Sequence, residues 1–156
     1  MIRRATYEDI PMIQKIAVES WRQTYQQIIP PKLQQQFLAF DYNYRQLRHR
    51  IDTTLFFVAL QQDVIVGFAN FSIGTRNELE TIYLSPAVFS EGIGHQLLVT
   101  GESFYPAGTE LYVRVNALNE RAIAFYTAHQ FTFVEQRLEQ IETIQFRTNT
   151  MHKILL

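Results

Sequence analysis

The chain has 156 residues, of which 47% are hydrophobic and 19% charged, a composition that predicts a single domain, residues 1–156, with an ordinary core. A formal net charge of −1 and the lack of basic runs argue against nucleic acid and acidic membranes as partners, so we expect a small molecule. No cysteine is present, which excludes a disulfide framework, a thiolate zinc site and a cysteine nucleophile. The N-terminus has no apolar signal core and nowhere do 18 apolar residues run together, so we expect a cytoplasmic location.

The first third of the chain is predicted to form a short strand followed by helices. Ile10, Ile13 and Ile16 recur at helical spacing after Thr6, which can cap a helix. Two consecutive prolines at positions 30 and 31 then stop the helical pattern. We expect a strand over Ile2–Ala5 and helices from Thr6 to about Tyr25, from about Lys32 to Phe40 and from Tyr44 to Ile51.

The remainder of the chain alternates between strand and helix patterns. Two apolar, β-rich segments flank the polar Gln61-Gln62-Asp63, which predicts a hairpin. The order of elements predicts a mixed α/β fold with one central sheet flanked by helices. We expect strands over Leu55–Leu60, Val64–Ser72, Leu79–Leu84 and Leu111–Asn116, helices from Ile93 to Phe104 and after Asn119, and two closing strands between Phe131 and Leu156 around Glu139-Gln140.

The stretch from Leu84 to Leu98 joins a strand to an amphipathic helix through Gly92-Ile93-Gly94. Glycines at the start of a helix let the backbone approach a ligand closely, and the first free N–H groups face any anion placed there. The turn therefore predicts a phosphate site. Because Gly-x-Gly turns are common, a plain strand-to-helix turn is the alternative.

Three segments together resemble the GCN5-related N-acetyltransferase (GNAT) family: Leu84-Ser85-Pro86, Gly92-Ile93-Gly94 with Leu97-Leu98, and Asn119 to Tyr126. The resemblance extends from Ile2 to about Ile154. It implies the GNAT acyl-CoA N-acyltransferase fold, with two strands splayed at the cofactor, and acetyl-CoA as co-substrate. By the same resemblance, residues from the strand, the loop and the later helix bind coenzyme A, namely Ile82, Tyr83, Leu84, Phe89, Ser90, Glu91, Gly92, Ile93, Gly94, His95, Asn119, Ala122 and Phe125.

The loop departs from the family pattern at three positions. Phe89 stands where Gln or Arg is usual, Ser90 where glycine is common and Glu91 where a basic residue often sits. A carboxylate near a diphosphate is repulsive unless it points into water. The family holds the diphosphate mainly with main-chain N–H groups, which side-chain changes leave in place while the turn keeps its shape.

Tyr126 is the candidate general acid. It lies seven residues after Asn119 and four after Ala122, so the three share one side of a helix capped by Asn119. A tyrosine, with an ordinary pKa of about 10, can protonate the thiolate that leaves in thioester aminolysis. The resemblance assigns that role to Tyr126, and to Asn119 a hydrogen bond with the pantetheine arm or the substrate. A core tyrosine packed beside Phe125 is the alternative.

Glu80 is the first candidate for the general base and Glu78 the second. They lie two apart on a predicted strand and so share one face, where Ile82 and Leu84 continue the row toward the loop. A carboxylate there can accept a proton from the incoming ammonium, and the family often places its base on this strand. Two solvated charges at a strand entrance are the alternative.

Trp21, Tyr25 and Tyr44 come from the region that covers the acceptor pocket in this family. Aromatic side chains there favour an amine with an apolar or polyamine body, with simple packing as the alternative. His95 is expected to touch only phosphate. His49, His129 and His152 are expected to have no carboxylate or histidine partner at ligand spacing, so we expect no metal site.

These residues predict an acetyl-CoA-dependent N-acetyltransferase that moves the acetyl group directly to a primary amine within a ternary complex. A small amine or polyamine is expected in preference to a protein N-terminus or lysine. Without a cysteine, the chain cannot use an acyl-cysteine intermediate. The alternative is a sensor that binds acetyl-CoA without turnover. The family's frequent dimers make a homodimer a further expectation.

Overall fold

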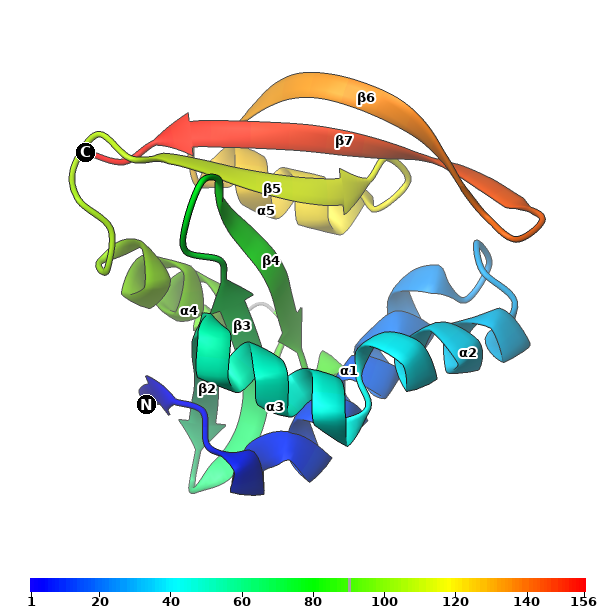
Figure 1. Cartoon of the computed structure of the whole chain (residues 1–156), viewed down its shortest axis with the longest axis horizontal. Helices are drawn as coiled ribbons and strands as arrows, with labels where there is room; N and C mark the ends of the chain where they lie inside the picture. The colour runs from blue at the N-terminus through cyan, green and yellow to red at the C-terminus, as the bar shows by residue number, and fades with distance from the viewer. Residues whose placement is uncertain (90) are drawn as a thin grey trace.

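The strands form one seven-stranded sheet in the computed structural model, which describes residues 1–89 and 91–156 (Figure 1). Their order is β1-β2-β3-β4-β5-β7-β6, in which β4 and β5 pair in parallel and the other neighbours pair antiparallel. The strands are β1 (Ile2–Arg4), β2 (Leu55–Gln61), β3 (Val64–Phe71), β4 (Asn77–Leu84), β5 (Glu110–Asn116), β6 (Thr132–Ile141) and β7 (Ile144–Ile154). The helices are α1 (Ile10–Tyr25), α2 (Pro31–Asp41), α3 (Tyr44–Thr53), α4 (Ile93–Glu102) and α5 (Glu120–Ala128).

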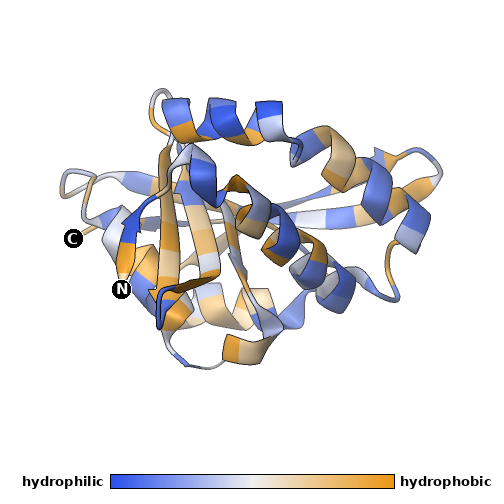
Figure 2. Ribbon diagram, turned by 90° about the horizontal axis from the view of Figure 1, so that it is seen from below, coloured by the Kyte–Doolittle hydropathy of each residue, from blue (hydrophilic) through white to orange (hydrophobic). Residues whose placement is uncertain are grey.

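Helices cover both faces of the sheet and bury two apolar clusters. On one face, α1, α2 and α3 pack around Ile13, Leu47 and Phe68. On the other, α4 and α5 pack around Phe71 and Leu97. Figure 2 shows the central strands mostly orange and the outer sides of the helices mostly blue, as amphipathic spacing requires. Within residues 1–89 and 91–156, no helix is both long and apolar enough to span a membrane.

Two of the expected boundaries differ from the structure. Thr6 does not begin α1 but a short 3-10 turn, Tyr7–Asp9, in which the Asp9 carboxylate accepts the Thr6 N–H at 2.8 Å. Glu139-Gln140 lies inside β6, and the hairpin turns at Glu142, whose φ is +53°. Neither Gly nor Pro marks this turn, so the alternating pattern alone placed it too early.

The parallel pair β4–β5 parts after three residues. Pairing runs from Asn77 with Leu111 to Leu79 with Val113, and beyond it the two strands diverge. The Ser85 N–H donates to the Val66 carbonyl at 2.8 Å, so the adjacent pair of Leu84 with Gly67 is a non-hydrogen-bonded pair of the β3–β4 ladder. Because the two kinds of pair alternate, the main-chain N–H groups of Leu84 and Ile82 face the gap left by β5.

A β-bulge at Glu80 breaks the expected row of side chains on β4. The partner of Phe71 is Leu79 and the partner of Asn70 is Thr81, so Glu80 is the extra residue. Leu79, Ile82 and Leu84 all pack into the cluster beneath α4. With strict alternation, Leu79 and Ile82 would point to opposite faces of the sheet. The prediction that Glu78, Glu80, Ile82 and Leu84 share one face is therefore wrong.

Candidate active site

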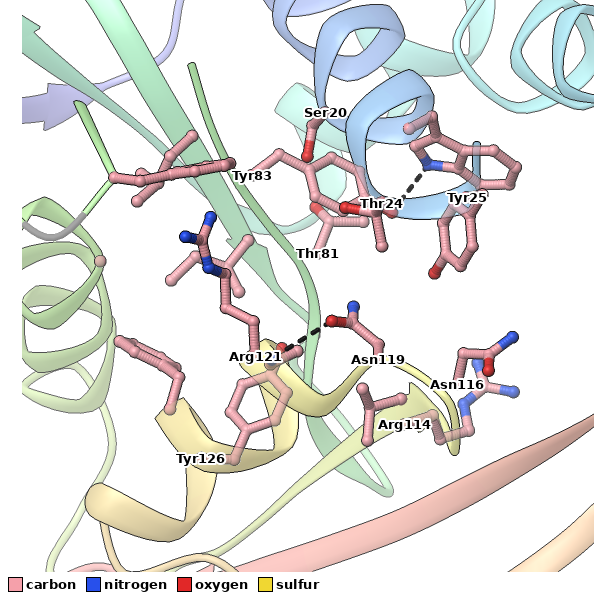
Figure 3. A pocket seen from close by; sticks show the side chains of 18 of the residues that line it. Ser20, Thr24, Tyr25, Thr81, Tyr83, Arg114, Asn116, Asn119, Arg121 and Tyr126 are labelled. Carbon is pink, nitrogen blue, oxygen red and sulfur yellow. Dashed lines mark hydrogen bonds between the residues drawn. The ribbon is translucent and has the colours of Figure 1, made fainter. Parts of the chain in front are cut away.

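A cavity of about 330 Å³ opens where β4 and β5 part, beneath the C-terminal half of α1 and beside the first turns of α4 and α5 (Figure 3). Five consecutive residues of β4 reach it because one edge of that strand is uncovered. The lining comprises Ser20, Trp21, Thr24, Tyr25, Glu80, Thr81, Ile82, Tyr83, Leu84, Phe89, Gly94, Arg114, Val115, Asn116, Asn119, Arg121, Ala122, Phe125 and Tyr126.

At the end of the cavity beside α4, the lining includes Gly94 from the start of that helix and the guanidinium group of Arg121. Gly92 caps α4 at φ +80°, in the region that favours glycine. At Gly94, an added Cβ would lie 3.1 Å from the Phe125 ring, so a larger residue would require that ring to shift by a few tenths of an ångström. The guanidinium carbon of Arg121 lies 4.1 Å from the centroid of the Phe89 ring. The helix N-terminus and this cation together make the end of the cavity attractive to an anion.

Helix α5 brings Asn119 and Tyr126 to the same cavity. Asn119 caps the helix, and its Oδ1 accepts the Ala122 N–H at 3.2 Å, which leaves its NH2 group for a ligand (Figure 3). Tyr126 is 7% exposed, and burial, with a smaller effect of Tyr83, raises the pKa of its phenol above the ordinary value. Tyr126 therefore stays protonated at neutral pH.

The two glutamates of β4 have different surroundings. Glu80 lines the cavity, and its Oε1 accepts a hydrogen bond from Asn70 Nδ2 at 2.8 Å. Burial, followed by the negative charge of Glu78, raises the pKa of Glu80 above its ordinary value. Glu78 is not among the lining residues, and its Oε1 is paired with Arg114 Nε at 3.0 Å. Glu80 is thus the carboxylate that a ligand can reach.

Aromatic side chains form the wall beneath α1. Trp21 stacks on Phe37, and its Nε1 donates to the Tyr83 hydroxyl at 3.0 Å. Tyr25 packs edge-on against Trp21 at 4.9 Å between ring centroids. Tyr44 lies elsewhere: it is 51% exposed and outside the lining, because α3 packs on β2 rather than over the gap.

The chain matches the family model of the acetyltransferase (GNAT) domain over residues 20–151. This protein is a GNAT-family N-acetyltransferase. One relative, the uncharacterized N-acetyltransferase YuaI of Bacillus subtilis, is 31% identical over 144 residues, covering 82% of this chain and 78% of YuaI. The spermidine N(1)-acetyltransferase of Thermoplasma acidophilum is 25% identical over 131 residues, covering 80% and 81% of the two chains.

Solved structures carry the same fold as this GNAT chain. A GCN5-related N-acetyltransferase from Rhodopseudomonas palustris superposes with a TM-score of 0.83 at 22% identity, covering 99% of this chain and 95% of the other. The PaiA N-acetyltransferase of Thermoplasma acidophilum, in complex with coenzyme A, gives 0.79 at 23% identity, covering 96% of each chain. At such identities the likeness establishes the fold.

The structure of this GNAT domain brings together many of the residues that the sequence singled out for the cofactor. Those that line the cavity are Ile82, Tyr83, Leu84, Phe89, Gly94, Asn119, Ala122 and Phe125. Glu91, Gly92, Ile93 and His95 lie outside the lining, with Ile93 buried in the core beneath α4. Ser90 lies outside the described residues.

The expectation that His129 and His152 have no histidine or carboxylate partner is wrong for this GNAT domain. The start of α4 lies beside the end of α5, which places His95 Nδ1 2.9 Å from His129 Nε2. On β7, His152 Nδ1 lies 2.8 Å from Glu110 Oε2. Within the described residues, no group of three or more His, Cys, Asp or Glu is arranged to hold a metal ion.

Sequence reasoning missed six polar residues of the cavity wall: Ser20, Thr24, Thr81, Arg114, Asn116 and Arg121. Arg114 and Asn116 alternate with the buried Val113 and Val115, so the period of two already placed them on the face of β5 opposite those valines. The position of Arg121 over Phe89 joins two segments distant in the sequence, and no local pattern marks it.

Proposed function

We propose that this N-acetyltransferase transfers an acetyl group from acetyl-CoA directly to a small primary amine within a ternary complex. The observation that carries the proposal is the open edge of β4, where the reachable carboxylate of Glu80 and the protonated phenol of Tyr126 line one cavity. One group can accept a proton and the other can donate one, as aminolysis of a thioester requires.

The cavity fits the acyl donor in three respects. Main-chain N–H groups of Ile82 and Leu84 face the gap, and that of Leu84 can bind an amide group of the pantetheine arm. The N-terminus of α4 and Arg121 present positive potential to the diphosphate. The Asn119 NH2 group adds a side-chain donor. PaiA of Thermoplasma acidophilum, which shares the fold, was solved with coenzyme A, and this supports the same ligand here.

In the proposed reaction, Glu80 and Tyr126 carry out the proton transfers. Glu80 takes one proton from the ammonium of the acceptor, and the free amine attacks the thioester carbonyl, which acetyl-CoA supplies. The main-chain N–H of Ile82, which lies between Glu80 and Leu84 on the open edge of β4, polarises that carbonyl. The carbon–sulfur bond breaks, and Tyr126 gives its proton to the departing sulfur. The second proton leaves the nitrogen as the amide forms and restores the Tyr126 hydroxyl, so one proton is released through Glu80.

Two measurements test the proposal. Calorimetry with acetyl-CoA and with free CoA measures binding, and a thiol-release assay over a panel of primary amines measures turnover. At about a hundred times its dissociation constant, acetyl-CoA should stabilise the fold by about 2.7 kcal/mol. Binding together with thiol release supports the enzyme. Binding without release for any amine would instead identify a sensor, and absence of binding would reject both.

A further inference from the structure

Glu80 and Arg114 line the end of the cavity where β4 and β5 part, which we call the acceptor end. Leu79 and Val113 form the last paired rung, so Glu80 and Arg114 hold the next position on their strands. Both line the cavity, and the positive charges of Arg50 and, to a smaller extent, Arg114 oppose the rise in the pKa of Glu80 that burial and Glu78 cause. Because both residues directly follow the last paired rung, one small ligand with two groups of opposite charge can reach them together.

Arg114 retains hydrogen-bond donors for a ligand. Only its Nε is engaged, by the Glu78 carboxylate at 3.0 Å, and its side chain is 60% exposed. Its two terminal NH2 groups have no hydrogen-bond partner within residues 1–89 and 91–156. A guanidinium presents five N–H donors in one plane and binds carboxylates through two of them.

Asn116 adds donors on the same wall. Its Oδ1 accepts the Leu118 N–H at 2.8 Å, which fixes the amide and leaves the NH2 group as the part available in the cavity. Figure 3 shows Asn116 and Arg114 side by side on β5. The β5 wall therefore offers donors, while the β4 wall offers the Glu80 carboxylate.

This distribution of charge disfavours a polyamine. The described charged residues of the lining are Glu80, Arg114 and Arg121, and Arg121 lies at the end assigned to the diphosphate. A second ammonium beside Glu80 would meet the terminal NH2 groups of Arg114, because the neighbouring Glu78 carboxylate is already paired with Arg114 Nε at 3.0 Å. Building on the proposed function, we infer that the acceptor is an α-amino acid, with its ammonium at Glu80 and its carboxylate at Arg114 and the Asn116 NH2 group. Its side chain then meets the aromatic wall of Trp21 and Tyr25.

Matched acceptors test this assignment. Each α-amino acid is compared with the amine left when its carboxylate is removed: lysine with cadaverine, phenylalanine with phenethylamine, and methionine with 3-methylthiopropylamine. Thiol release gives kcat/KM for each member. Trp21 is the sole tryptophan and lines the cavity, so its fluorescence reports acceptor binding to the CoA complex independently of turnover. We expect at least one amino acid to exceed its amine by about tenfold or more in both readouts.

Two variants distinguish a specific role of Arg114 from the general effect of removing a positive charge. Arg114→Gln should reduce the preference to about threefold or less by raising the KM of the amino acid, with the KM of the amine unchanged or lower. Arg137→Gln is the matched control, because Arg137 is also exposed and ion-paired, with Glu135 at 2.9 Å on β6, and does not line the cavity. It should keep the preference of the wild-type protein.

The outcomes distinguish this assignment from the proposed function. Equal or better use of the decarboxylated amines overturns the amino-acid acceptor and leaves the acetyltransferase intact. A preference that Arg114→Gln does not change also overturns it. No thiol release with any acceptor, despite binding of acetyl-CoA, rejects the proposed function and the acceptor together. A preference for the amino acid that falls in Arg114→Gln and persists in Arg137→Gln supports it.

Discussion

Tyr126→Phe removes a single hydroxyl from the cavity and should lower kcat without unfolding the protein. The ring is buried against Phe131 and Phe125, and phenylalanine keeps those contacts. Within the described residues the hydroxyl makes no hydrogen bond, so its loss should change the melting temperature by no more than about 2 °C. The substitution therefore separates chemistry from packing.

The expected loss in kcat is about 10²-fold, or about 2.7 kcal/mol on the barrier. General acids contribute about 10² to 10⁴, and the raised pKa of Tyr126 makes it a weak acid, so the lower figure applies. Because the phenol stays protonated, the wild-type rate should not fall with rising pH below about pH 10 through loss of this proton.

Initial rates of thiol release at saturating acetyl-CoA and acceptor measure kcat, and calorimetry measures the dissociation constant of CoA. We expect the CoA affinity of Tyr126→Phe to stay within about twofold of the wild-type protein. A kcat within about threefold of wild type, with KM unchanged, would refute the role of Tyr126 as proton donor.

Three further substitutions test other parts of the site and the core. Glu80 must be ionised to accept a proton and its pKa is raised, so the wild-type rate should increase as the pH rises through that pKa. In pH–rate profiles, Glu80→Gln should show no such increase, and its rate at higher pH should be about 10²-fold below that of the wild-type protein. Arg121→Gln should raise the KM of acetyl-CoA about three- to tenfold, because the side chain is exposed, yet leave rates with acetyl-pantetheine, which has no diphosphate, unchanged. Gly101→Ala would place a Cβ 2.1 Å from the Phe71 ring and should cost about 1–3 kcal/mol in chemical unfolding; unchanged stability would show that α4 can shift freely.

The elements that sequence patterns placed correctly are those with a strong period. The apolar residues of α1 recur at helical spacing and are buried, and the strands β2 and β3 flank the polar turn as expected. The splayed pair β4–β5 came from the family resemblance rather than from any pattern. Composition and periodicity contain no signal for where two paired strands separate, because that depends on what packs between them.

Local irregularities and contacts between distant segments explain why the predictions for β4, Tyr44 and the histidines differ from the structure. The bulge at Glu80 reverses the faces of the following residues, and nothing in Glu78 to Leu84 announces an extra residue. Tyr44 was grouped with Trp21 because both come from the region that covers the acceptor pocket in this family, but Tyr44 lies on α3, which packs on β2. His95 and His129 meet only because α4 and α5 lie together.

The early parting of β4 from β5 puts a free sheet edge in the middle of the molecule rather than at its rim. An exposed edge normally invites another chain to add a strand. Here the uncovered groups of Ile82 and Leu84 lie inside a cavity, where only a slender, extended molecule with amide groups of its own can complete the ladder. Because the main chain recognises such a molecule, side-chain substitutions along β4 can change which acceptor the protein prefers without weakening the binding of that extended molecule.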